Sequence, residues 1–277
     1  MTAAAAAPAT QQAASQTGAS RVALATVLDT KNRPLMDVGL DDFVVQEAGE
    51  PRDVLSVRPA DYPIVVLLDN GSEARSDFPT MRKAVARFLE RIGQRPVALG
   101  TFGNVPAMVT TFEDDRATVM QRLGAIEATA TAGSQLLQGA ALGGQTIERT
   151  GSLFSAIIIL SATPVDSSRN GAEEMIAPIV DSGAILHVIA NRSTPPSGAP
   201  GFRPGQALHS LADQTRGQYT TIYSAASYQS ALDRLADRLT SELMIEYLVP
   251  VGSKPNDVKV GVRLAGARVR GLGVAPK

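Results

Sequence analysis

The chain has 277 residues, a formal net charge of −1, two histidines, and no cysteine or tryptophan. This length provides the core of one large domain or of two modest ones. The composition excludes disulfides, thiolate metal sites, cysteine nucleophiles and three-histidine metal sites. A net charge near zero argues against a general nucleic-acid binder, and no apolar run reaches the roughly 18–20 residues that cross a bilayer. We therefore expect a globular protein whose chemistry rests on carboxylates, hydroxyls and backbone groups.

Residues 1–20 consist almost wholly of alanine, threonine, glutamine and serine, and the first charged side chain is Arg21. Such a segment buries too little apolar surface to offset the entropy lost on ordering, so the composition predicts a disordered leader. The segment lacks the basic start and the leucine-rich or valine-rich stretch of an intact secretory signal.

Short β-strands are predicted at both ends of the remaining chain. Residues 22–29 are rich in apolar and β-branched side chains, and residues 42–57 have the pattern of a hairpin that turns near Gly49. Towards the C-terminus, residues 244–250 form a further apolar run. Residues 257–264 alternate between apolar and polar side chains, which is typical of a strand with one buried face.

Strands and helices alternate between these two flanks. The wholly apolar run 64–69 is typical of a strand that is covered on both faces, and the residues after it carry one apolar stripe at helical spacing. Further strands over 155–161 and 184–190 lead to a long helix over 225–243. This alternation predicts an α/β fold with a doubly wound, mostly parallel sheet. Ligands of such sheets bind beyond the carboxyl ends of the strands.

Three polar segments stand at the ends of these strands or at the start of a helix. Residues 69–73 (Asp-Asn-Gly-Ser-Glu) follow the first apolar strand, residues 133–134 (Gly-Ser) precede a helix, and residues 161–164 (Ser-Ala-Thr-Pro) follow a central strand. This succession resembles the von Willebrand factor type A (VWA) domain, which has Asp-x-Ser-x-Ser, Gly-Thr and Ser-Asp-Gly at these places. Residues 29–57 and 211–250 are similar to the segments at the two ends of this domain in a bacterial VWA-related family.

The resemblance implies a VWA-like domain over residues 60–243. It also implies that residues 21–58 and 244–272 meet in a small β-sandwich-like subdomain, because the first and last elements of such a domain can leave it on the same side. Members of the bacterial family are usually exported, which implies a secreted or periplasmic location.

In the VWA family these segments form a metal-ion-dependent adhesion site, whose ligands are only partly present here. Asp69 keeps the first carboxylate, Glu73 stands at the second serine position, and Ser134 offers a hydroxyl at the threonine position. Gly71 and Ala162 replace a hydroxyl and a carboxylate by groups that bind no metal. Because Mg²⁺ takes about six oxygen ligands, the resemblance implies either no cofactor or a weakly bound Mg²⁺. Without a metal, we expect Asp69 to accept hydrogen bonds from backbone N–H groups and Glu73 to be an acid in the first turn of a helix. Ser134 would then cap a helix.

Residues 191–205 form a proline- and glycine-rich stretch that is expected on the same carboxyl edge of the sheet. Long loops of compact domains either bind a partner or are disordered, and Phe202 with Arg203 is the kind of pair that anchors an interface. We expect a protein partner at this edge. Its other contact residues are predicted to be Asn70, Gly71, Ser72 and Gly133.

Enzyme motifs are missing from the sequence, which has no phosphate-binding glycine loop, no dinucleotide fingerprint and no Gly-x-Ser-x-Gly elbow. We predict a non-enzymatic protein-interaction module of the adhesion or scaffold type, with metal dependence lost or weak. The main alternative is Mg²⁺-dependent adhesion through Asp69, Glu73 and Ser134. A more remote alternative is a hydrolase that uses Ser72, which follows a strand as a nucleophile would but has no histidine supplied to it.

Overall fold

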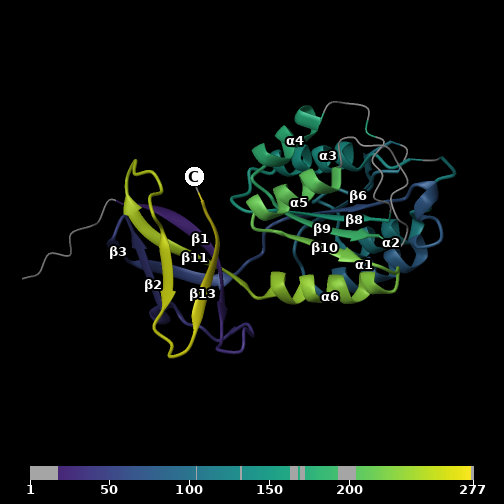
Figure 1. Ribbon diagram of the computed structural model, residues 1–277. Coiled ribbons are helices and arrows are strands. Elements are labelled where there is room, and N and C mark those ends of the chain that lie inside the picture. Colours follow the sequence, from purple (N-terminus) through teal and green to yellow (C-terminus); the bar gives the residue numbers. More distant parts are fainter. Residues whose placement is uncertain are drawn as a thin grey trace, which may run out of the picture.

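The chain folds into an α/β domain and a β-sandwich that lie side by side (Figure 1). The computed structural model describes residues 18–103, 105–131, 133–162, 168, 172–192 and 204–275. Most of the predicted leader and of the 191–205 stretch, with Phe202 and Arg203, lies outside the described residues. No helix of the described residues is long and apolar enough to cross a membrane.

The β-sandwich is built from both flanks of the sequence. Its first sheet has the order β13-β1-β11-β4 and is formed by β1 (Gly18–Leu28), β4 (Val54–Pro59), β11 (Glu242–Pro250) and β13 (Arg268–Ala275). Its second sheet has the order β12-β2-β3 and is formed by β2 (Phe43–Glu47), β3 (Glu50–Arg52) and β12 (Lys259–Val262). A 3-10 helix, η1 (Leu40–Asp42), precedes β2.

Side-chain alternation along the strands creates the core of the sandwich. Ala23, Ala25 and Val27 of β1 point to the same side and pack with Phe43 and Val45 of β2. Strand β1 pairs antiparallel with β11 from Gly18 to Thr26, so the two ends of the chain close the sandwich together. The predicted subdomain of paired flanks is therefore confirmed.

The α/β domain contains a six-stranded sheet of order β10-β9-β8-β5-β6-β7. Its strands are β5 (Ile64–Leu68), β6 (Val97–Thr101), β7 (Ala107–Met108), β8 (Ala156–Ser161), β9 (Ile185–Asn191) and β10 (Gln218–Ile222). All neighbours in this sheet are parallel except β6 and β7. The predicted doubly wound, mostly parallel sheet is confirmed.

Helices cover both faces of this sheet. One face carries α1 (Phe78–Arg91), α2 (Arg116–Ala125) and α6 (Ser227–Thr240), and the other carries α3 (Leu136–Glu148), α4 (Ala172–Asp181) and α5 (Pro204–Gln214). A short 3-10 helix, η2 (Ser72–Ala74), follows β5. Along β5, Val66 packs into the first of these layers and Val65 into the second, which explains why the strand is apolar at every position.

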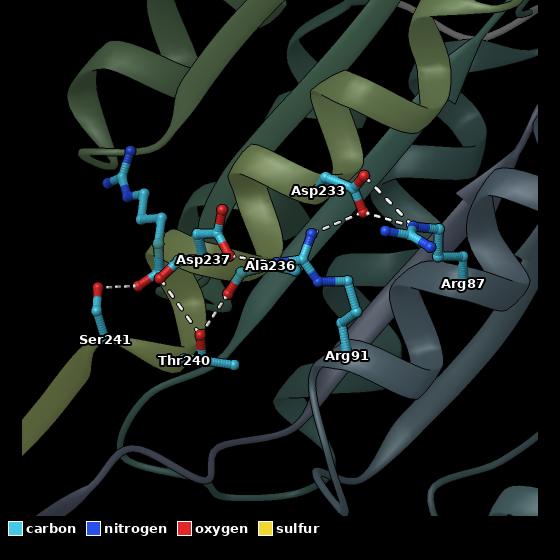
Figure 2. A network of polar contacts seen from close by, with 8 residues as sticks. Arg87, Arg91, Asp233, Ala236, Asp237, Thr240 and Ser241 are labelled. Carbon is cyan, nitrogen blue, oxygen red and sulfur yellow. Dashed lines mark hydrogen bonds and ion pairs between the residues drawn. The ribbon is translucent and has the colours of Figure 1, made fainter. Parts of the chain in front are cut away.

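Helices α1 and α6 are joined at their surfaces by a network of ion pairs (Figure 2). Asp233 of α6 lies 3.0 Å from Nε of Arg87 and 2.7 Å from Nη1 of Arg91, and Asp237 also pairs with Arg91. Hydrogen bonds from Arg91 and Arg87 hold the pKa of Asp233 below its usual value. The network links the last turns of α1 to the second half of α6.

The two units are in apolar contact. Leu24, Leu272 and Ala275 on the outer face of the sandwich pack into the same core cluster as Phe154 and Ile185 of the α/β domain. The sandwich is therefore packed directly against the amino-terminal edge of the parallel sheet, opposite the edge where VWA ligands are expected.

A buried polar cluster joins the units where the chain crosses between them. Glu242, the first residue of β11, is fully buried and accepts a hydrogen bond from the hydroxyl of Tyr62. Burial raises the pKa of Glu242, while Arg238 and Arg95 act in the opposite direction. Arg95 also donates a hydrogen bond to the backbone oxygen of Leu239 over 2.6 Å. This bond holds the last turn of α6 next to the cluster.

Candidate binding site at the carboxyl edge of the sheet

Asp69 is the first residue after β5, and its carboxylate is fully buried. Oδ1 accepts a hydrogen bond from the backbone N–H of Gly71 over 3.2 Å, and Oδ2 accepts one from the N–H of Ala162 over 3.1 Å. Backbone donors satisfy a buried carboxylate without a metal. Asp69 therefore connects the ends of the neighbouring strands β5 and β8.

Gly71 leaves room for the segment that carries Gly133. A Cβ atom at residue 71 would lie 2.7 Å from the backbone oxygen of Gly133, which is closer than real Cβ contacts allow. The same point lies 3.4 Å from Oδ1 of Asp69 and 3.4 Å from Oε2 of Glu73. The chain itself therefore occupies the position where a side chain at residue 71 would begin.

Glu73 is exposed and bonds to its own surroundings. Its Oε2 atom accepts hydrogen bonds from the hydroxyl of Ser72 over 3.1 Å and from the N–H of Gly133 over 3.2 Å. The hydroxyl of Ser72 thus donates to a carboxylate. Both histidines lie elsewhere, with His187 buried in β9 and His209 beside Asp213 on α5, so neither acts as a base for Ser72.

Ser134 is buried, with 1% of its surface exposed, and its Oγ atom has no hydrogen-bond partner among the described residues. The expectation that Ser134 caps a helix is wrong, because α3 begins at Leu136 and its N-cap is Gln135. Gln135 has a non-helical backbone conformation, with φ of −93° and ψ of 63°, and its N–H donates to the backbone oxygen of Phe102 over 2.7 Å.

Asn70 holds the neighbouring loops in place. Its Oδ1 atom accepts from the N–H of Gly103 over 2.9 Å, and its Nδ2 atom donates to the backbone oxygen of Glu127 over 3.2 Å. Its backbone oxygen accepts from the N–H of Thr129 over 2.7 Å. Asn70 thereby ties the end of β6 and the 126–131 connection to the end of β5.

Tyr228, at the start of α6, lies beneath this edge. It is fully buried, and its hydroxyl donates to the backbone oxygen of Ser161 over 2.8 Å. Burial raises the pKa of Tyr228, and the carboxylates of Asp69 and Asp77 raise it further. The phenol is therefore neutral and acts as a hydrogen-bond donor that supports the loop after β8.

The side chains present do not fit a tightly bound Mg²⁺. That ion takes six oxygen ligands at about 2.0–2.1 Å. Asp69 and Glu73 already accept hydrogen bonds, Gly71 and Ala162 supply no side-chain oxygen, and Ser134 contributes one hydroxyl. Within the part of the chain that the structure describes, no group of three or more aspartate, glutamate or histidine side chains is arranged to hold a metal.

Two exposed apolar side chains at this edge were not among the predicted site residues. Tyr223 follows β10 and is 74% exposed, and Val105 follows β6 and is 70% exposed. Strands β10 and β6 are four neighbours apart in the sheet, which corresponds to about 19 Å at 4.8 Å per strand. Tyr223 was missed because the short, polar strand Gln218–Ile222 that precedes it was not predicted.

This sheet order, with an acidic residue directly after β5 and helices on both faces, is that of a VWA fold. A von Willebrand factor type A protein from Catenulispora acidiphila is similar with a TM-score of 0.54 and 13% identity, covering 94% of this chain and 73% of that one. Proximal thread matrix protein 1 from the mussel byssus is similar with a TM-score of 0.54 and 12% identity, covering 74% of this chain and 50% of that one.

The PilB minor pilin from Streptococcus sanguinis is also similar, with a TM-score of 0.50 and 9% identity, covering 66% of this chain and 62% of that one. The chain thus spans half of the byssus protein and less than two thirds of the pilin. Another structure of the byssus protein has a zinc-occupied metal-ion-dependent adhesion site. No protein-family model and no curated protein matches the sequence.

Proposed function

We propose that this protein is a non-enzymatic interaction module that binds a partner protein at the carboxyl edge of its VWA sheet, without a tightly bound metal. The observation that carries the proposal is the contact between Gly71 and Gly133. The backbone oxygen of Gly133 lies 2.7 Å from the Cβ position of residue 71, where the family has a metal-binding serine. The carboxylate of Asp69 is bonded to backbone N–H groups on both oxygens. A metal is then unnecessary for holding these loops together.

The partner surface in this proposal combines polar loop residues with apolar anchors. Tyr223 offers an aromatic ring with a polar tip, which is a side chain that interfaces favour. Val105 adds an apolar contact at the other end of the edge, and Ser72 and Gly133 lie between the two strands' ends. We include Phe202 and Arg203 in this surface because they follow β9 in the sequence.

We further propose a secreted or periplasmic location. This proposal rests on the resemblance to an exported bacterial family. It is in keeping with the names of two structural neighbours, a byssus thread matrix protein and a minor pilin.

A second candidate function is Mg²⁺-dependent adhesion through Asp69, Glu73 and Ser134. It is favoured by one observation, the buried hydroxyl of Ser134 that lacks a partner among the described residues. In this alternative the hydroxyl becomes a metal ligand and an acidic side chain of the partner completes the shell.

Site-directed cross-linking distinguishes these functions from each other. The purified chain, with a photo-cross-linking residue in place of Ser72, is incubated with envelope and secreted proteins of its source organism, with and without EDTA. We expect one cross-linked partner that is retained in EDTA and lost when Tyr223 is changed to Asp. Val251→Asp is the matched control, because Val251 lies in the sandwich and is 72% exposed. A partner that is captured equally by Tyr223→Asp contradicts the site, and a partner that is lost in EDTA supports the metal-dependent alternative.

A further inference from the structure

A small cavity of about 130 Å³ lies between α6 and the strands β9 and β10 at one edge of the parallel sheet (Figure 1). Strand pairing puts Gln218 of β10 beside His187 of β9, and Thr220 beside Ile189. Because side chains alternate along a strand, these residues share the face of the sheet on which Ile189 packs with α6. The cavity is closed on its other side by residues of α6, which are Ala231, Arg234 and Leu235.

His187 is the most buried polar residue of this cavity. It is 1% exposed, and neither of its ring nitrogens has a hydrogen-bond partner among the described residues. Burial lowers the pKa of His187 to about 3 and the charge of Arg238 lowers it further, so the imidazole is neutral at pH 7. A neutral imidazole has one N–H donor and one acceptor, and leaving both unmatched inside a protein costs free energy. A molecule that enters the cavity therefore finds a hydrogen-bonding group without a partner.

The other polar side chains that line the cavity are also unmatched. Those of Gln218, Thr220 and Arg234 form no hydrogen bond or ion pair with any residue that the structure describes. Gln218 and Arg234 are exposed and mark the mouth of the cavity, whereas Thr220 is half-buried. Polar side chains that converge on one cavity without bonding to one another are typical of a ligand site.

The charge around the cavity favours an anion. No aspartate or glutamate is among the described residues that line it. The acids of α6, Asp233 and Asp237, pair with arginines of α1. Glu242 lies 3.8 Å from Nε of Arg238. Arg234 is thus left without a counter-ion in the described structure, and the mouth of the cavity is positive.

The size and the lining of the cavity favour a small carboxylic acid. Guanidinium, amide, hydroxyl and imidazole groups all supply donors here, and a carboxylate only accepts hydrogen bonds. Ile189, Ala231 and Leu235 offer apolar contact to a short alkyl chain. An internal cavity of about 150 Å³ holds a molecule as large as benzene, so this one has room for an acid of a few carbon atoms.

We propose that the cavity between β9, β10 and α6 binds a free short-chain monocarboxylic acid of about the size of propionate. Its carboxylate accepts a hydrogen bond from the imidazole of His187 and is neutralised by Arg234. Its alkyl chain lies against Ala231 and Leu235. The cavity lies where β10 begins, at Gln218, so the proposal does not depend on the site at the carboxyl edge of the sheet.

Imidazole NMR tests this proposal directly, because the chain has only two histidines. The full chain is labelled with ¹³C at Cε1 of histidine, and sodium propionate is added at neutral pH and constant ionic strength. We expect a saturable shift of the His187 signal with a Kd of about 1 mM or tighter. The signal of His209 should not move, because His209 is exposed on α5, which covers the other face of the sheet.

Further ligands define the chemistry that the cavity recognises. Propionamide has the shape of propionate without its charge, and inorganic phosphate has charge without an alkyl chain. N-acetylglutamate amide carries the same carboxylate on a peptide-like backbone, so it represents a glutamate side chain of a partner protein. We expect each of these to bind at least about tenfold more weakly than propionate, since the cavity needs both charge and an alkyl chain and has no room for a backbone.

Variants of exposed arginines locate the anion. Arg234→Gln should weaken propionate binding at least about tenfold, and Arg234→Lys by no more than about threefold, because lysine keeps the charge. Arg122→Gln is the matched control and should leave binding unchanged. Arg122 is likewise exposed on a helix, α2, and forms no hydrogen bond or ion pair with a described residue.

Several results overturn the proposal. Absence of a saturable His187 shift up to about 10 mM propionate means that the cavity holds water only. Equal binding of propionate and propionamide, or of propionate and phosphate, removes the basis for a carboxylic acid. Unchanged binding in Arg234→Gln places the anion elsewhere. Binding of N-acetylglutamate amide as tight as that of propionate assigns the cavity to a protein side chain and overturns the free acid.

Discussion

Replacing Gly71 by alanine adds one methyl group at the most crowded point of the carboxyl edge. The backbone of Gly71 has φ of −63° and ψ of 169°, which any residue adopts, so the cost of the change is steric alone. The new Cβ would lie 2.7 Å from the backbone oxygen of Gly133, and an ordinary contact begins at 3.4 Å. The Gly133 segment must therefore retreat by about 0.7 Å, which is the kind of overpacking shift that costs about 1–3 kcal/mol.

The retreat also weakens two hydrogen bonds that hold this segment. They run from the N–H of Gly133 to Glu73 and from the N–H of Ser72 to the backbone oxygen of Thr131, each over 3.2 Å. We expect Gly71→Ala to lower the free energy of unfolding by about 2 kcal/mol, combining overpacking with these bonds. The measurement is urea unfolding followed by circular dichroism, together with hydrogen exchange of residues 129–135, which should become faster.

Gly124→Ala is the control for this experiment. Gly124 lies in α2, and a Cβ there meets no atom within 4 Å. Alanine should stabilise this helix position by up to about 1 kcal/mol. If Gly71→Ala leaves both the free energy of unfolding and the exchange of the 129–135 segment unchanged, the close packing of Gly133 on Gly71 is refuted.

Two further predictions concern charged and titratable groups. Asp233→Asn removes the acid that two arginines of α1 share, and it should lower the free energy of unfolding by about 0.5–1 kcal/mol at low salt and by less in 1 M NaCl, both read from urea unfolding. His187 is buried, and burial lowers its pKa to about 3. Because the pKa is lower in the folded state, the protein should lose stability as the pH falls below 6.5, by about 3 kcal/mol at pH 4.5. His187→Leu should flatten this part of the pH profile, and parallel losses in the variant and the original protein would contradict the assignment.

Much of the fold follows from the apolar pattern of the sequence. Residues 64–68 are all apolar because β5 is covered by helices on both faces. A short, wholly apolar run of this kind is typical of a buried parallel strand. Strand β10 was missed because Gln218–Ile222 is short and polar, as is common for a strand at the edge of a sheet. The start of α3 was misplaced because Gln135 takes a non-helical backbone conformation, with φ of −93° and ψ of 63°, which local capping rules do not reveal.

The candidate site was predictable in composition and only partly in geometry. The sequence indicates which metal ligands of the family are missing, because Gly71 and Ala162 have no side-chain oxygen. It does not indicate that the N–H of Ala162 turns onto Asp69, or that Gly133 closes over Gly71. Those contacts join segments far apart in the sequence, and they depend on the register of parallel strands.

The central claim is that binding at the carboxyl edge needs no tightly bound metal, and a titration with Mn²⁺ tests it most directly. Free Mn²⁺ is measured by electron paramagnetic resonance as the full-length chain is added, and Asp69→Ala is titrated in parallel. We predict binding weaker than about 1 mM that is the same in both proteins. One equivalent of Mn²⁺ bound more tightly than about 100 μM and lost in Asp69→Ala would contradict the claim.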